Sequence, residues 1–142
     1  IQKEIIHDYH IGILTTLIKK EIFEKLEGYN NFFHICGDFE FNVRASKDYK
    51  IIGLKEPLAH YRVHDQNISK DLNREVIELE HCLKIFKEKK FDNVNKFQNY
   101  INYRKCIKDL SERKFLEAFK VFLKINFSIF KLKIFYFIFF RR

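Results

Sequence analysis

The chain has 142 residues, of which 46% are hydrophobic and 32% charged, and it contains one proline and four glycines. This composition excludes a disordered chain and favours a folded protein rich in helix. Basic residues outnumber acidic ones by 27 to 19, and the net charge of +8 favours polyanions, phosphorylated ligands or anionic membrane surfaces as partners without choosing among them.

The first half of the chain has the pattern of strands alternating with helices. Residues 9–18, YHIGILTTLI, are rich in β-branched side chains and too short for a well-buried helix, which favours a strand. Residues 19–28 carry apolar side chains at helical spacing and end at Gly28, a favourable residue just beyond a helix C-terminus. We therefore expect a strand followed by a helix.

Residues 38–47, DFEFNVRASK, fit two patterns. Their alternating apolar residues suit a strand, whereas Asp38 in an N-cap position and basic residues in the second half suit a helix. We expect a helix. Residues 49–55 and 57–64 then have the pattern of two short strands, the second opened by Pro57, which strands tolerate at their first residue.

From Arg74 onward apolar residues repeat at helical spacing, first around Leu79 and again around Ile101. A third helix is expected after Ser111, which stands in a plausible N-cap position. The polar stretch before Arg74 suggests a boundary near residues 69–73. We expect a mixed α/β part over residues 1–70 and an α-helical extension over 71–142.

Cys36, Cys82 and Cys106 are odd in number and lack C-x-x-C spacing. This favours a reducing, cytoplasmic compartment over a disulfide framework. The chain contains no methionine and begins with Ile1, from which we expect an internal or C-terminal piece of a longer protein. The absence of a glycine-rich phosphate loop or a signal peptide then says little about that longer protein.

Four motifs follow one another between Tyr9 and Ser69: a strand running into KKEIFEKLEGYN, the acidic GDFEFNVR, then YKIIGLKEPLA, and finally YRVHDQNIS. In this order they resemble the C-terminal half of the catalytic domain of family 2 glycosyltransferases, which have the GT-A fold. The resemblance implies an α/β fold, the C-terminal half of a Rossmann-like nucleotide-sugar transferase domain. It also implies that a sugar moves from a nucleotide-sugar to an acceptor hydroxyl, with inversion, in polysaccharide or glycolipid synthesis.

The resemblance assigns the general base to Asp38, because the family places a carboxylate at this point of the motif to take the proton of the acceptor hydroxyl. Gly37 stands where many members have a second acid, and Glu40 lies two residues away, where side chains on a helix diverge. A helix N-cap is the simpler interpretation of Asp38, and the two roles are compatible.

Further site residues are implied in the same way. His64 would complete the coordination of a divalent cation, Mg or Mn, that binds the diphosphate of the donor. Arg62 would bind the diphosphate or line the acceptor cleft. A surface histidine and an arginine in a structural ion pair are the plain alternatives. The substrate-binding set is Arg62, Tyr61, His10, Gly12 and Gly37.

No D-x-D motif occurs in the chain. We therefore expect the donor-binding half to lie upstream and the chain to be inactive alone. The expected partners are a nucleotide-sugar donor and a saccharide or lipid-linked acceptor. An alternative from a different class is a non-enzymatic basic module that binds an anionic membrane or nucleic acid. No RNP-like strand or helix-turn-helix signature supports nucleic acid, so we expect no nucleic-acid partner.

The C-terminal tail, residues 125–142, interleaves aromatic residues with lysines. Its apolar run, residues 134–140, is too short to span a bilayer. The tail suits a helix lying on the inner face of the cell membrane. Equally, it would pack on the body of the protein or pair with another chain.

Overall fold

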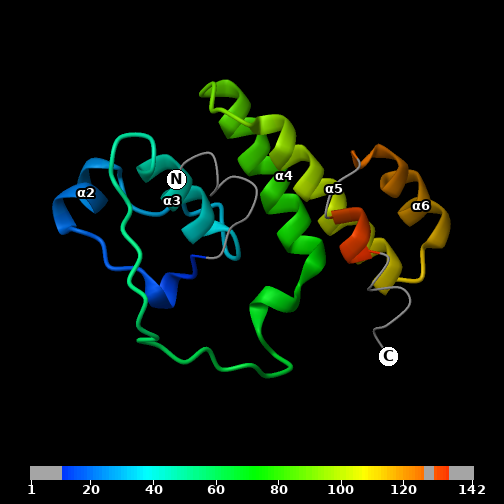
Figure 1. Cartoon of the computed structure of the whole chain (residues 1–142), viewed down its shortest axis with the longest axis horizontal. Helices are drawn as coiled ribbons and strands as arrows, with labels where there is room; N and C mark the ends of the chain where they lie inside the picture. The colour runs from blue at the N-terminus through cyan, green and yellow to red at the C-terminus, as the bar shows by residue number, and fades with distance from the viewer. Residues whose placement is uncertain (1–10, 127–129, 135–142) are drawn as a thin grey trace. The chain divides into compact units, whose positions relative to one another are not determined.

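The computed structural model describes residues 11–126 and 130–134 (Figure 1). The chain divides into two compact units, Ile1–Asp71 and Leu72–Arg142. The first unit holds the 3-10 helix η1 (Ile13–Thr15), the helices α2 (Lys20–Lys25) and α3 (Gly37–Ala45), and the 3-10 helix η2 (Ile68–Lys70). The second unit holds α4 (Leu72–Glu88), α5 (Val94–Ser111) and α6 (Phe115–Lys124).

In the first unit, α2 ends one residue earlier than predicted: Leu26 is the C-cap, so Glu27 and not Gly28 is the first residue beyond it. The N–H of Gly28 donates to the carbonyl of Phe23 at 2.9 Å, and the N–H of Glu27 donates to Glu24 at 3.0 Å, the two bonds of a Schellman motif. Both Glu27 and Gly28 have positive φ. The positive φ of Gly28 favours glycine, and a Cβ there would also lie 3.0 Å from the ring of Phe23, so the ring would have to shift by a few tenths of an ångström.

The helix predicted over residues 38–47 is present as α3, and it forms the centre of the first unit. Phe39, Phe41 and Val43 are buried on it. The ring of Phe41 packs against Phe23 and Tyr29, with centroids 5.5 and 5.1 Å apart. Aromatic packing therefore fastens α3 to the end of α2 and to the loop that follows it.

The prediction of an α/β fold is wrong, since the described residues contain helices and no strand. In place of the expected strand, residues 11–18 contain only the short 3-10 helix η1, and the two strand candidates over 49–64 are not strands either. Their side chains, including Ile52, Leu58 and Val63, are largely exposed. A strand forms only where a second strand completes its hydrogen bonds and covers a face, and the part of the chain described here provides no such neighbour.

The second unit is built of helices, as the apolar spacing predicts. Figure 1 shows α4 and α5 side by side, and α5 packs against both α4 and α6. The fully buried side chains at the α4–α5 contact are large and apolar, with Phe86, Phe97 and Ile101 among them. A second cluster of Cys106, Ile107, Ala118, Ile125 and Ile134 joins α5 to α6 and to the helical residues 130–134.

Tight C-terminal turns end α4 and α5. The N–H of Phe91 donates to Phe86 at 2.9 Å and that of Lys114 to Asp109 at 2.8 Å, and the residue before each donor has positive φ. Ser111 is the last residue of α5, with its hydroxyl donating to Lys108, so the prediction that Ser111 caps the third helix is wrong. None of the helices within the described ranges is long and apolar enough to cross a lipid bilayer.

Candidate functional site

The first unit contains an open pocket of about 530 Å³, a volume within the usual range for small-molecule sites. Its wall is formed by residues 12–15, by the loop before α3, by the first turn of α3, and by the segment leading into η2. Four residues singled out from the sequence line this pocket together: Gly12, Gly37, Asp38 and Tyr61.

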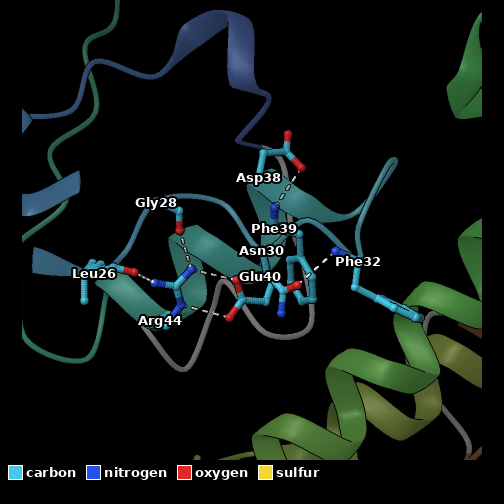
Figure 2. Close-up of polar contacts among 8 residues, drawn as sticks. All are labelled: Leu26, Gly28, Asn30, Phe32, Asp38, Phe39, Glu40 and Arg44. Atoms are coloured by element: carbon cyan, nitrogen blue, oxygen red, sulfur yellow. Dashed lines mark hydrogen bonds and ion pairs between the residues drawn. The ribbon is translucent and has the colours of Figure 1, made fainter. Parts of the chain in front are cut away.

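Asp38 lies in the first turn of α3, one residue inside the helix, and Cys36 occupies the N-cap. The prediction of Asp38 as the N-cap is therefore wrong by position. Its carboxylate nevertheless accepts the N–H of Phe39 at 2.7 Å through Oδ1, the bond drawn in Figure 2, and the N–H of Ile13 at 3.1 Å through Oδ2. These two bonds fix the carboxylate at the start of α3, where the positive end of the helix dipole suits an acidic side chain.

Residues 12–16 are held so that Ile13 can reach Asp38. The hydroxyls of Thr15 and Thr16 both donate to the carbonyl of Gly12, at 2.9 and 3.0 Å. The Asp38 carboxylate then links this turn to α3, two segments 25 residues apart in sequence. One side chain thus shapes the pocket wall and places a negative charge on it.

Glu40, the second acid of the motif, has a structural role on α3. It is 3% exposed, and its two carboxylate oxygens accept from the Arg44 guanidinium at 2.9 Å each. The same guanidinium donates to the carbonyls of Gly28, at 2.8 Å, and Leu26. Figure 2 shows Asp38 and Glu40 on different sides of α3, and of the described residues that line the pocket, Asp38 is the one with a carboxyl group.

Two tyrosines in the lining respond differently to their surroundings. Burial, and then the negative charge of Asp38, raise the pKa of Tyr29, so its hydroxyl keeps its proton and remains a donor. Hydrogen bonds with Ser69 and Asn67 lower the pKa of Tyr61, whose hydroxyl lies 2.9 Å from the hydroxyl of Ser69. The pocket therefore presents a carboxylate together with phenol hydroxyls of different acidity.

Asn67 organises the YRVHDQNIS motif. Its amide nitrogen donates to the hydroxyl of Tyr61 and to the carbonyl of Arg62, at 3.0 Å each, and its side-chain oxygen accepts the backbone N–H of His64 at 2.7 Å. Tyr61 is thereby held at the pocket. The side chains of Arg62 and His64 are exposed and are not among the lining residues. His10 lies outside the described residues.

Several lining residues were missed at the level of sequence. Tyr29, Phe33 and His34 come from the loop before α3, and Ser69 from η2. The signal was the aromatic, histidine-bearing stretch 29–36, which follows a helix-ending glycine and leads into an acidic helix. Binding residues concentrate in such loops when rigid elements flank them.

The predicted divalent cation can be compared with the residues present. In residues 11–126 and 130–134, His, Cys, Asp and Glu side chains do not gather in groups of three or more that could hold a metal ion. His64 is a single candidate ligand on an exposed turn, and stable sites need several ligands converging on the ion. The residues described here do not make a metal site by themselves, so the cation stays a prediction.

Comparison with family models, with curated proteins and with solved structures finds no match to this chain. A half of a GT-A domain would contribute strands to a central sheet, and the structure has helices and no strand over the residues it describes. The resemblance to family 2 glycosyltransferases is therefore wrong as an assignment of family and fold. Each of its motifs is short, and two of the four depend on apolar runs that form no strand and are largely exposed.

Proposed function

We propose that the pocket of the first unit binds an acceptor saccharide and that Asp38 takes the proton of its attacking hydroxyl during glycosyl transfer from a nucleotide-sugar. The observation that supports this most is the Asp38 carboxylate, fixed by two backbone N–H groups at the wall of a pocket of suitable volume. The proposal rests on this site and not on a fold, because one chemistry recurs on unrelated folds.

The lining suits a sugar ring. Tyr29, Phe33 and Tyr61 offer apolar ring faces for the C–H bonds of a pyranose, while Asp38, Ser69 and the tyrosine hydroxyls offer acceptors and donors for its hydroxyls. A few placed polar groups among apolar ones are typical of small-molecule sites. A saccharide therefore fits the chemistry of the lining better than an acidic ligand, which the charge of Asp38 would repel.

The proposed step balances as a single displacement. The acceptor oxygen forms a bond to the anomeric carbon, the bond from that carbon to the donor phosphate breaks, and the nucleotide diphosphate leaves with the electron pair. The hydroxyl proton passes to the carboxylate of Asp38. General-base assistance of this kind is worth about 10² to 10⁴ in rate. The net charge of +8 favours a phosphorylated donor, and we further propose a cytoplasmic location, in keeping with three buried cysteines that form no disulfide.

The test is transfer by the full-length gene product with Asp38→Asn, using radiolabelled UDP-glucose, UDP-N-acetylgalactosamine and GDP-mannose with a panel of methyl glycosides as acceptors. Asparagine keeps the size of the side chain and an accepting oxygen. We expect kcat to fall about 10² to 10⁴-fold, with the KM for the acceptor changed by less than about threefold.

Asp48→Asn is the matched control, because Asp48 is an exposed aspartate in the same unit, just after α3. It should leave both constants unchanged. Transfer that survives Asp38→Asn at the wild-type rate would remove Asp38 from the chemistry. Absence of transfer from all three donors by the wild-type protein would count against the activity itself.

A further inference from the structure

Helix α6 exposes an apolar face in the second unit. Phe115, Leu116, Phe119 and Leu123 are between 59% and 74% exposed. With about 100° between successive residues, these four side chains fall within an arc of roughly 100° on one side of the helix. We refer to these four residues as the α6 face.

The other side of α6 is already occupied. Ala118 is buried, and Val121 and Phe122 pack against the cluster that contains Cys106 and Ile107. The helix is therefore apolar on two sides, and its attachment to α5 leaves the α6 face uncovered. An exposed group of large apolar side chains on one helix commonly marks an interaction surface.

Basic side chains border the α6 face. Lys120 and Lys124 follow it on one side of the helix, by the same 100° spacing. On the other side, Lys131 has its Nζ 5.1 Å from the ring centre of Phe122, which is next to Phe115 on the helix surface. From residue 113 to residue 134 the sequence has six basic side chains and one acidic one, Glu117.

We propose that the α6 face docks on a bilayer that contains anionic phospholipid, with its aromatic and leucine side chains in the boundary between headgroups and acyl chains. Lysines that flank an apolar helix face can bury their stems and reach lipid phosphates with their ammonium groups. At about 1.5 Å per residue the helix is only about 15 Å long, so it would lie in the plane of the interface. This docking does not depend on the activity proposed for Asp38, which belongs to the other unit.

Charge complementarity favours this occupant over a second copy of the chain. A second α6 face would bring its own lysines against those of the first, and like charges oppose such pairing. An anionic lipid surface offers phosphates to every lysine at once. The exposed Leu132, on the helical stretch 130–134 that packs in the same cluster, adds apolar surface next to Lys131 and Lys133.

The test is co-sedimentation of the full chain with vesicles of phosphatidylcholine, with and without 30 mol% phosphatidylglycerol. Each lysine near an anionic surface contributes about a fivefold gain in binding, so Lys120→Gln/Lys124→Gln should weaken binding about 25-fold. Phe119→Ser/Leu123→Ser should weaken it at least tenfold by removing apolar burial, an order-of-magnitude estimate. Binding should also fall when NaCl is raised.

Matched controls come from α4 in the same unit. Ile77 is an exposed apolar residue, and Lys84 and Lys87 are exposed lysines. Ile77→Ser and Lys84→Gln/Lys87→Gln should each change vesicle binding by less than about twofold, because neither touches the α6 face. Far-UV circular dichroism checks that all variants keep their helices.

Three outcomes would overturn the proposal. The first is a wild-type chain that does not pellet with anionic vesicles. The second is a folded Phe119→Ser/Leu123→Ser variant that pellets as the wild type does. The third is a dimer, seen in sedimentation equilibrium, that this variant abolishes while vesicle binding is unchanged; the α6 face would then be a contact between copies. Loss of vesicle binding in the α6 variants alone, with the α4 controls intact, supports docking.

Discussion

Replacing Arg44 by methionine should destabilise the first unit strongly. The Arg44 guanidinium neutralises the buried Glu40 and also donates to the carbonyls of Leu26 and Gly28, so it joins α3 to the end of α2. Arg44 lies over the ring of Phe41, with its Cζ 5.2 Å from the ring centre. Methionine keeps an apolar stem beside this ring. The loss would therefore come from electrostatics and hydrogen bonding rather than from packing.

The loss of stability can be worked out from the polar groups that lose their partner in Arg44→Met. Arg44→Met leaves the buried carboxylate of Glu40 without its partner, together with two carbonyls that lose their donor. Removing one partner of a buried ion pair costs about 3–5 kcal/mol. Glu40→Gln removes the charge and leaves Arg44 with both carbonyls, so we expect a smaller loss of about 2 kcal/mol. Combined, the two changes should lose less than the sum of the single ones by at least about 1 kcal/mol.

Native-state hydrogen exchange, followed by NMR at the α3 amides, is the appropriate assay, because the two units need not unfold together. The backbone amide of Val43, a residue that is fully buried, reports the stability of the first unit. Lys20→Met is the control, since Lys20 and Glu24 form a pair of the same spacing that is 87% and 63% exposed; it should cost less than about 0.5 kcal/mol. A loss below about 1 kcal/mol for Arg44→Met would refute the reasoning.

Two further predictions concern the second unit. Lys90 has φ of 54° in the turn that ends α4, so Lys90→Gly should raise the stability of this unit by about 1 kcal/mol in thermal unfolding. Lys89→Gly, at a neighbouring position without positive φ, should not raise it. A loss of stability with Lys90→Gly would contradict the account. Burial, then the charge of Asp109, raise the pKa of Cys106 to about 11. The folded state therefore keeps a thiol proton that the unfolded chain releases near the ordinary pKa of cysteine. The contribution of this thiol to stability is complete below the ordinary pKa and should be lost as the pH rises toward 11. Urea unfolding at several pH values should show this decline flattened by Cys106→Ala, and an identical pH dependence in the variant would contradict the assignment.

The helices could be predicted because their signals are local. Apolar residues at helical spacing lie along α4, α5 and α6, and the contacts that bury them come from neighbouring helices in the same unit. The predicted ends of the helices were less accurate than the helices themselves. The sequence predicts N-caps at Asp38 and Ser111, although α3 begins at Gly37 and Ser111 is the last residue of α5, because Asp and Ser also suit the positions that they occupy.

In the part of the chain that the structure describes, the predicted strands are not formed, because a strand depends on a partner strand that its own residues do not specify. Residues 49–64 have the apolar content of strands, yet they form no strand and most of them are exposed. For the site, the acidic motif drew attention to Asp38, and Gly12, Gly37 and Tyr61 line the same pocket. The aromatic loop residues Tyr29 and Phe33 were missed, because the stretch 29–36 indicates a binding loop without specifying which of its side chains will face a pocket.

The most direct test of the proposed chemistry is chemical rescue of Asp38→Ala. Alanine removes the carboxylate and leaves room for formate, which can supply a base where the side chain stood. The amides of Phe39 and Ile13 lose their bonds to Asp38 in this variant, so unchanged shifts of amides that do not touch Asp38, such as that of the buried Val43, would confirm that the variant keeps its fold. With saturating donor and acceptor, we expect the lost transfer rate to recover at least tenfold, an order-of-magnitude expectation, and to saturate as formate is added. A folded Asp38→Ala variant that transfers at the wild-type rate, or one whose activity formate does not restore, would contradict the role of Asp38 as the base.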